Sequence, residues 1–361
     1  MTTYLLAGGG TAGHVNPMLA VADRLRAEQP EARIVILGTA EGLESRLVPE
    51  RGYELSVIPK VPFPRRPNQA AVQFLSKMRA AITGAKQLMQ REGVDVVVGF
   101  GGYVSTPAYL AARDLHLPIV IHEANARPGL ANRLGARFTR FVGVTFPGSK
   151  LPHARVVGMP LRAPIEQLAQ HDEVRATLRT EAMTRFGLNP ELPTLLVTGG
   201  SLGARRLNET VRESATALLD AGWQVLHLVG GSPEIDDPQL AGYLQLHYLD
   251  RMELALAAAD FVVSRAGSST VSELSAVGLP AVYVPYAVGN GEQRLNARSV
   301  VEAGGALLVD DVDFVPSWVW AELMPLLHDR ERQRTMAAAA RSVGVVDGTA
   351  QTVSLIAAAL A

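Results

Sequence analysis

The sequence LLAGGGTAG at residues 5–13 recurs in closely similar form as LLVTGGSLG at residues 195–203, 190 positions later. Each copy has a short apolar run, adjacent glycines, a hydroxyl residue, one further residue and a closing glycine. An apolar run that ends in glycines before a helix is typical of strand–loop–helix units, whose backbone N–H groups at the helix N-terminus bind phosphate. The repeat therefore predicts two similar α/β halves, each with one anion-binding loop.

Around both loops, short apolar runs alternate with longer segments of helical spacing, which is the pattern of a parallel sheet covered by helices. Predicted strands of the first half lie at residues 4–7, 33–37, 55–58, 94–99, 119–122 and 141–145, and a further strand ends at 157. Predicted strands of the second half lie at 194–198, 224–229, 261–264, 281–284 and 306–309. Predicted helices include 16–28, 69–91, 106–115 and 174–186. We expect two facing Rossmann-like domains, with both loops lining one cleft at the carboxyl ends of the strands.

The stretch GLNPELP at residues 187–193 is rich in residues that break helices and strands. We therefore predict a linker here, between a first domain at 1–186 and a second at 194–361. The last part of the second domain, residues 316–361, has only helical spacing. A length of 361 residues suits two domains of ordinary size.

Composition excludes several classes of protein. The 34 basic and 35 acidic residues give a net charge of −1, so no chain-wide field favours nucleic acid. The absence of cysteine excludes disulfides, thiolate metal sites and a cysteine nucleophile. No uncharged apolar run approaches the roughly 18 residues of a spanning helix, and the N-terminus does not resemble a secretory leader. We expect a soluble, cytoplasmic protein that at most lies on a membrane surface.

The first glycine loop matches the dinucleotide pattern G-x-G-x-x-G at residues 8–13. The acidic residue that such sites need about 20 residues later is missing, because the second strand ends in LGT at 37–39. Phosphate binding by the loop remains the simpler interpretation. His14, at the mouth of the loop, is a candidate base, phosphate ligand or helix cap.

The second glycine loop also fits the G-x-S-x-G elbow of hydrolases, with Ser201 as nucleophile and an acid and a histidine following in the required order. The first loop carries Thr11 at the equivalent position, however, so phosphate binding explains both loops. A hydrolase would also leave the first half of the chain without a function.

Three further segments carry polar side chains near predicted strand ends. In RAGSSTVSE at residues 265–273, Thr270 and Glu273 form either a capping box or part of a helix start that binds a diphosphate, with Glu273 accepting from a ribose. The polar loop at 289–297 could contact sugar hydroxyls or simply be solvated. We interpret the acidic pair in DVD at 311–313 as a solvated turn and predict no metal site.

Residues 51–100 hold eight basic and three acidic side chains, a local charge of +5. A helical stripe in this stretch is expected to face the core. The alternative is an interfacial patch for anionic lipid that includes Phe63, Arg65 and Arg66. The stripe consists of Phe74, Met78, Ile82, Ala85 and Met89.

Seven motifs, in order along nearly the whole chain, resemble those of the MurG family of N-acetylglucosaminyltransferases. They are GGTAGH (9–14), GGYVS (101–105), HEAN (122–125), GMPLR (158–162), GGSLGAR (199–205), RAGSSTVSE (265–273) and EQRLNA (292–297). The resemblance implies a GT-B fold and an inverting transfer without metal or other cofactor. The sugar would move from UDP-N-acetylglucosamine to the 4-hydroxyl of the N-acetylmuramyl unit of lipid I, giving lipid II for peptidoglycan.

By motif position, the resemblance also implies site residues, with His14 as our candidate base. Implied donor contacts are Thr11, Ala12, Gly13, Asn125, Arg162, Ser201, Leu249, Arg265, Ser268, Ser269, Thr270, Glu273 and Gln293. Implied acceptor contacts are Gly9, Gly10, Gly13, His14, Gly102, Tyr103 and Glu123. The chain departs from the family at Met159, Leu161 and Glu292, so a sugar contact by Glu292 is not carried over.

The same resemblance implies a peripheral protein at the cytoplasmic face of the cell membrane, on an anionic surface and near other cell-wall synthesis proteins. Two alternatives remain open at this point. One is an enzyme like UDP-N-acetylglucosamine 2-epimerase, and the other is a non-catalytic module that binds a nucleotide sugar. An epimerase would make a new UDP-sugar without any acceptor, and a binding module would turn nothing over.

Overall fold

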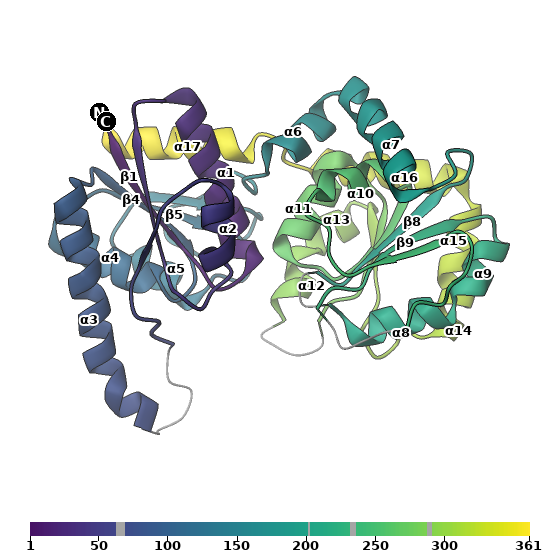
Figure 1. The fold of residues 1–361 in the computed structure, drawn as a ribbon, viewed down its shortest axis with the longest axis horizontal. Coiled ribbons are helices and arrows are strands. Elements are labelled where there is room, and N and C mark those ends of the chain that lie inside the picture. Colours follow the sequence, from purple (N-terminus) through teal and green to yellow (C-terminus); the bar gives the residue numbers. More distant parts are fainter. Residues whose placement is uncertain (63–68, 201–202, 232–235, 287–290) are drawn as a thin grey trace. The chain divides into compact units, whose positions relative to one another are not determined.

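The computed structural model describes residues 1–62, 69–200, 203–231, 236–286 and 291–361. The chain forms two compact units, one of residues 1–162 together with 347–361 and the other of residues 163–346. Each unit is built around one parallel sheet with helices on its faces (Figure 1). The predicted α/β class with two Rossmann-like domains is thus confirmed.

The first unit contains a seven-stranded sheet in the order β3-β2-β1-β4-β5-β6-β7. Its strands are β1 (Thr3–Gly8), β2 (Arg33–Gly38), β3 (Leu55–Val57), β4 (Val96–Gly101), β5 (Ile119–Glu123), β6 (Phe141–Val144) and β7 (Ala154–Val156). Its helices are α1 (Ala12–Glu28), α2 (Glu44–Glu50), α3 (Gln69–Glu92), α4 (Ser105–Asp114), α5 (Leu130–Gly135) and α17 (Gly348–Leu360). The chain order reverses between β1 and β4, and ligands of open α/β sheets bind at such a point.

The second unit has a six-stranded sheet in the order β10-β9-β8-β11-β12-β13. Its strands are β8 (Thr194–Thr198), β9 (Gln224–Leu228), β10 (Tyr243–Leu246), β11 (Phe261–Ser264), β12 (Ala281–Tyr283) and β13 (Ala306–Leu308). Its longer helices are α6 (Ala163–Gln170), α7 (Asp172–Phe186), α8 (Arg205–Glu213), α10 (Met252–Ala258), α11 (Ser268–Val277) and α16 (Arg330–Val343), and the shorter ones are α9 (Ala215–Asp220), α12 (Glu292–Asn296), α13 (Arg298–Glu302), α14 (Pro316–Trp318) and α15 (Met324–His328). Here the order reverses between β8 and β11.

The central strands β1, β4, β8 and β11 are mostly apolar because both faces of each sheet are covered there. Along β1, Leu5 and Ala7 pack into the core under α3 and α4, whereas Tyr4 and Leu6 pack into the core under α1 and α17. This alternation follows from the two-residue period of a strand. The stripe on α3 belongs to the first of these cores, so its predicted core-facing role is confirmed. The alternative lipid patch at residues 63, 65 and 66 lies outside the described residues.

The predicted assignment of residues 316–361 entirely to the second domain is wrong for α17. This helix packs on α1 and on strands β4 to β6 of the first unit, beside α1 in Figure 1. The hydroxyl of Thr349 donates to the carbonyl of Leu161 at 2.9 Å. Val353, Leu355 and Ile356 complete the apolar core that α1 leaves open. Burial of this apolar face explains why the last helix joins the first sheet.

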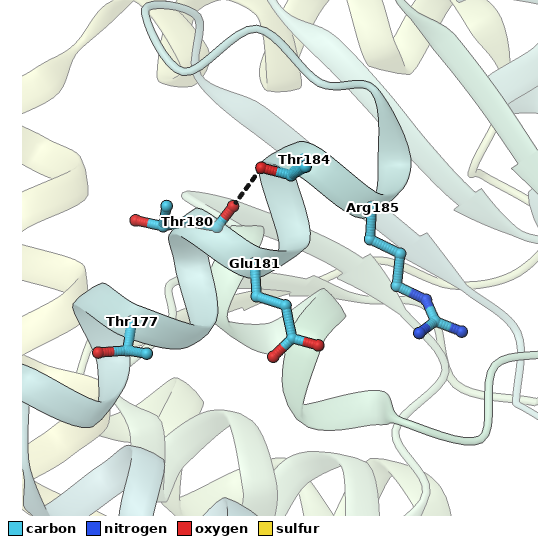
Figure 2. Close-up of a pocket in the computed structure, with 5 residues that line it drawn as sticks. All are labelled: Thr177, Thr180, Glu181, Thr184 and Arg185. Atoms are coloured by element: carbon cyan, nitrogen blue, oxygen red, sulfur yellow. Dashed lines mark hydrogen bonds between the residues drawn. The ribbon is translucent and has the colours of Figure 1, made fainter.

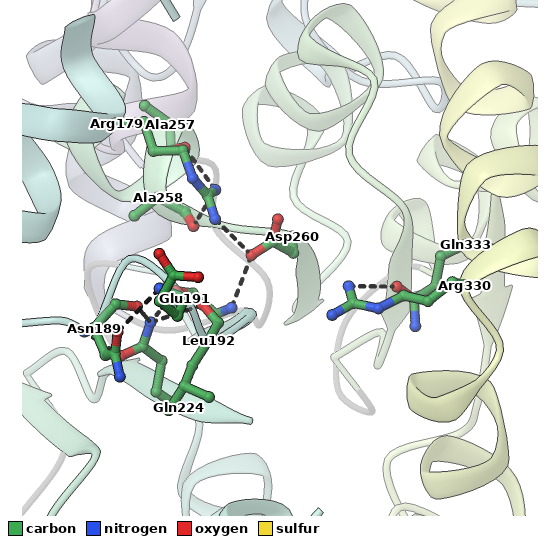
Figure 3. A network of polar contacts seen from close by, with 11 residues as sticks. Arg179, Asn189, Glu191, Leu192, Gln224, Ala257, Ala258, Asp260, Arg330 and Gln333 are labelled. Atoms are coloured by element: carbon green, nitrogen blue, oxygen red, sulfur yellow. Dashed lines mark hydrogen bonds and ion pairs between the residues drawn. The ribbon is translucent and has the colours of Figure 1, made fainter. Parts of the chain in front are cut away.

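The predicted linker at residues 187–193 is also wrong, because this segment is bound inside the second unit (Figure 3). That unit begins at residue 163, so the predicted assignment of residues 163–186 to the first domain is wrong as well. The Gln224 side chain donates to the carbonyls of Asn189 at 2.8 Å and Leu192 at 3.1 Å, and accepts from the Asn189 N–H at 2.9 Å. Asp260 accepts from the Thr194 N–H at 2.8 Å. The breaker-rich stretch is therefore the tight connection between α7 and β8.

One segment among the described residues, Arg330–Leu360, is long and apolar enough to cross a membrane by length and composition. The structure divides it into α16 and α17, which pack in different units. Its apolar character is thus used in two protein cores.

Candidate active site

The first glycine loop joins β1 to α1, and α1 begins at Ala12, four residues earlier than predicted. His14 therefore lies in the first turn of the helix. Its Nδ1 atom lies 3.1 Å from the carbonyl oxygen of Gly9 and 3.4 Å from the Thr11 hydroxyl. A carbonyl can only accept, so Nδ1 of the neutral ring carries the hydrogen. Nε2 then has a lone pair, which suits a proton acceptor.

Two glycines at the end of β4 pack against this loop. Gly101 has φ +96°, and a Cβ there would lie 3.1 Å from Nε2 of His14. Gly102 has φ +84°, and a Cβ there would lie 2.3 Å from the carbonyl oxygen of Gly9. Both positions thus need glycine for conformation and for space. Tyr103 is 43% exposed next to them, with the Lys60 ammonium 5.8 Å from its ring centre.

Glu123 ends β5 and is buried. Its oxygens accept from the N–H groups of Asn125 and Gly129, each at 2.9 Å, and from the Asn132 amide at 3.0 Å. Burial raises the pKa of this carboxyl, while the hydrogen bonds and the charge of His14 oppose the rise. Glu123 therefore organises the loop at 124–129, which includes Asn125.

His122, the residue before it, is buried, and its Nε2 atom lies 2.9 Å from the carbonyl oxygen of Gly158. Burial lowers the pKa of His122 to about 4. The ring is therefore neutral near pH 7 and donates through Nε2. This bond fixes the start of the segment 158–162, which ends at the half-buried Arg162.

Sequence reasoning missed Glu44, which is 0% exposed at the start of α2. One carboxylate oxygen accepts from the Gly10 N–H at 2.8 Å. The other accepts from the N–H and the hydroxyl of Thr39, at 3.0 and 2.8 Å. A signal existed in the glycines at 38 and 42, which shortly precede a glutamate otherwise expected on a helix surface.

In the second unit, α11 begins at Ser268 with Gly267 as its N-cap residue. Of the two interpretations of Thr270 and Glu273, the capping box is therefore wrong, because Thr270 already lies inside the first turn. Ser269 has a buried hydroxyl without a hydrogen-bond partner among the described residues. Glu273 lies further along the helix and is partly exposed. A helix start with an unpartnered hydroxyl suits an anionic ligand.

Arg265 lies between β11 and this helix and is 8% exposed. Its Nη1 atom donates to the carbonyls of Val284 at 3.0 Å and Pro285 at 3.2 Å, and pairs with Asp311 at 2.5 Å. Asp311 also pairs with Arg206 at 3.4 Å. Residues 311–313 form the predicted turn, but the Asp311 carboxylate is paired and half-buried rather than solvated. Among the described residues, no three His, Asp or Glu side chains form a group that could hold a metal ion.

Other predicted donor contacts lie on nearby segments of the second unit. The Gln293 side chain accepts from the Tyr286 N–H at 2.9 Å, and Asn296 donates to the carbonyl of Ala266 at 3.3 Å, so α12 is tied to the start of α11. Leu249 is half-buried shortly after β10. Ser201 lies outside the described residues.

A surface depression of about 620 Å³ lies along α7, away from both glycine loops in sequence (Figure 2). The hydroxyls of Thr180 and Thr184 donate to carbonyls of their own helix at 3.1 Å, and Glu181 pairs with Arg251. Because these polar groups already have partners, we assign the depression no ligand.

Comparison with known proteins shows what this pair of units is. The model of the glycosyltransferase family 28 N-terminal domain matches residues 4–144, and that of the C-terminal domain matches residues 194–352. The chain belongs to glycosyltransferase family 28. Within this family it is 60% identical over 356 residues to the UDP-N-acetylglucosamine--N-acetylmuramyl-(pentapeptide) pyrophosphoryl-undecaprenol N-acetylglucosamine transferase of Leifsonia xyli, covering 99% of this chain and 98% of that protein. It is 53% identical to the protein of that name from Streptomyces avermitilis, covering 99% and 98%.

Similar solved structures agree with this assignment. The crystal structure of MurG from Acinetobacter baumannii matches with a TM-score of 0.78 and 28% identity, covering 99% of this chain and 100% of that one. The predicted MurG resemblance and GT-B fold are confirmed. A UDP-GlcNAc 2-epimerase from Neisseria meningitidis matches with a TM-score of 0.69 at 15% identity, covering 99% and 100%, which is a likeness of fold alone.

Proposed function

We propose that this family 28 transferase moves N-acetylglucosamine from UDP-N-acetylglucosamine to the 4-hydroxyl of the N-acetylmuramyl unit of lipid I, giving lipid II. This proposal rests on one observation: the chain is 50–60% identical, along nearly its whole length, to several transferases. The name of those transferases states both the donor sugar and the acceptor. The arrangement of the first glycine loop supports it, because that loop presents a histidine with an available lone pair.

The donor sugar is α-linked and the product is β-linked, so one in-line displacement suffices. The 4-hydroxyl oxygen of the acceptor bonds to the anomeric carbon while the bond from that carbon to the diphosphate oxygen breaks. The electron pair goes to the β-phosphate, and the hydroxyl proton goes to Nε2 of His14. The Gly9 carbonyl, which accepts from Nδ1, stabilises the resulting imidazolium.

Negative charge grows on the β-phosphate as UDP leaves. We assign its stabilisation to the start of α11, where Ser268, Ser269 and Thr270 offer N–H groups and hydroxyls, and to the nearby charge of Arg265. Glu273 is the proposed ribose partner and Gln293 a proposed sugar contact. In this scheme neither a metal nor another cofactor takes part.

We also propose that the protein binds the cytoplasmic face of the membrane peripherally, because lipid I is a membrane lipid. The local charge of +5 in residues 51–100 supports attraction to anionic lipid. Contact with other cell-wall synthesis proteins would follow from that location.

The deciding experiment measures UDP release from UDP-N-acetylglucosamine with and without a lipid I analogue. The transferase releases UDP only with acceptor, whereas an epimerase forms a new UDP-sugar without acceptor and a binding module forms nothing.

His14→Ala should lower kcat about 10²- to 10⁴-fold, the usual contribution of a general base. The affinity for the donor should stay nearly constant. A raised acceptor KM with kcat preserved would instead make His14 a pyrophosphate ligand.

A further inference from the structure

The buried carboxylate of Glu44 is placed behind the first glycine loop in an unusual environment. Both of its oxygens face backbone N–H groups, one from Gly10 at 2.8 Å and one from Thr39 at 3.0 Å. Backbone N–H groups can only donate, so this arrangement fits a carboxylate rather than a carboxylic acid. Within the described part of the chain, no ion pair to Glu44 is found.

Glycines make room for this carboxylate. A Cβ at Gly9 would lie 2.4 Å from a Glu44 oxygen, one at Gly38 would lie 2.6 Å from its Cγ, and one at Gly42 would lie 1.9 Å from its other oxygen. Burying a carboxylate without a cation is costly, and an apolar side chain would fill the same space without that cost. The local sequence is thus arranged to keep a negative charge at this point.

The charge reaches His14 through a single peptide group. The Gly10 N–H, which donates to Glu44, and the Gly9 carbonyl, which accepts from Nδ1 of His14 at 3.1 Å, belong to the same peptide bond. In a trans peptide these two groups point in opposite directions, so carboxylate, peptide and imidazole form one hydrogen-bonded chain. An anion on the N–H side polarises the peptide and makes its oxygen a stronger acceptor.

We propose that Glu44 is a positioning residue that orients His14 and stabilises its protonated ring through the Gly9–Gly10 peptide. The arrangement is a carboxylate–histidine pair with a peptide between its two members. It holds the hydrogen on Nδ1, which keeps Nε2 available for the acceptor proton, and it favours the positive charge that forms during transfer. This inference rests on the proposed function, in which His14 is the base.

The test is Glu44→Gln, which keeps the shape and removes the charge, in the wild-type and His14→Ala backgrounds. In the wild-type background kcat should fall about 10- to 100-fold, less than the full effect of a base because one peptide intervenes. The KM for UDP-N-acetylglucosamine should change less than about twofold. In the His14→Ala background the same change should have little effect on kcat, because Glu44 acts through the missing ring.

A matched control is Asp95→Asn. Asp95 accepts from the Thr3 N–H at 2.8 Å, so it is also a carboxylate on a backbone N–H, but at the opposite end of β1. Its substitution should leave kcat unchanged. If Glu44→Gln does not fold, Thr39→Val removes only the hydroxyl donor to Glu44 and should lower kcat a few-fold, again only when His14 is present.

An equal loss of kcat in both backgrounds would overturn the inference and leave Glu44 as a scaffold for the loop. A preserved kcat in Glu44→Gln would overturn it as well. The proposed function fails separately, if the wild-type protein releases no UDP on addition of the lipid I analogue or if His14→Ala is as active as the wild type.

Discussion

Replacing His122 by glutamine should remove part of the acid sensitivity of the first unit. Burial lowers the pKa of His122 to about 4, below its ordinary value near 6.5. Between pH 4 and pH 6.5, His122 is therefore mostly protonated in the unfolded chain and mostly neutral in the folded chain. The stability that the neutral ring contributes is complete above pH 6.5 and is lost as the pH falls toward 4. As the pH falls from 7.5 to 5.5, this single group lowers the free energy of unfolding by about 1.3 kcal/mol.

Glutamine at position 122 can still donate to the Gly158 carbonyl but does not titrate, so the variant should lack this loss. Hydrogen exchange of amides in β5 measures the stability of the first unit at both pH values. Tryptophan fluorescence gives an internal reference, because Trp223, Trp318 and Trp320 all lie in the second unit. If wild-type protein and variant lose the same stability in β5 between pH 7.5 and 5.5, His122 is not the buried neutral group that the structure indicates.

Three other predictions concern the two loops and the membrane. Gly102→Ala should lower kcat at least about tenfold, because its Cβ would meet the Gly9 carbonyl at 2.3 Å, whereas Gly52→Ala, also at positive φ but in open space, should cost only about 1–2 kcal/mol of stability and leave kcat unchanged. Glu273→Ala should weaken UDP-sugar binding by about 1–3 kcal/mol in calorimetry, and an unchanged affinity would end its assignment to the ribose. Charge reversal at residues 65 and 66 should reduce binding to anionic vesicles at low salt, and a wild-type protein that ignores such vesicles would refute the lipid patch.

The sheets could be predicted from sequence because buried parallel strands are short apolar runs, some of which, such as β1, β2 and β4, end in glycine. All five strands predicted in the second half lie within a residue or so of those observed. The strand β10 (Tyr243–Leu246) was missed, since it is short, lies at the sheet edge and contains Gln245. Edge strands need less apolar surface than central ones, so their sequence signal is weaker.

The site was predictable only where its parts are close together in sequence. The loop carrying His14 and the start of α11 could be found, because each is one continuous motif. Glu44, Asp311 and the last helix could not, since each acts on a segment far away in the chain. Hydrophobic spacing shows that a residue lies on a helix or in a turn, but it does not show which loop a side chain reaches.

The side chains that pack behind the two glycine loops differ in charge. That difference suits the proposed base His14 in the first loop and the donor contact that the resemblance implies for Ser201 in the second. Behind the second loop, Gly230 leaves no room for a Cβ against Gly203, and Asn208 donates to the Val229 carbonyl at 2.9 Å. The side-chain oxygen of Asn208 accepts from Nε2 of His227. Burial lowers the pKa of His227 to about 3, so its ring is neutral and the group behind the second loop carries no charge. A carboxylate about 8 Å from a bound phosphate charge would repel it by about 2 kcal/mol at an effective dielectric of 20. A loop that binds diphosphate is therefore best supported by neutral groups, whereas a loop whose histidine becomes positive gains from a carboxylate behind it.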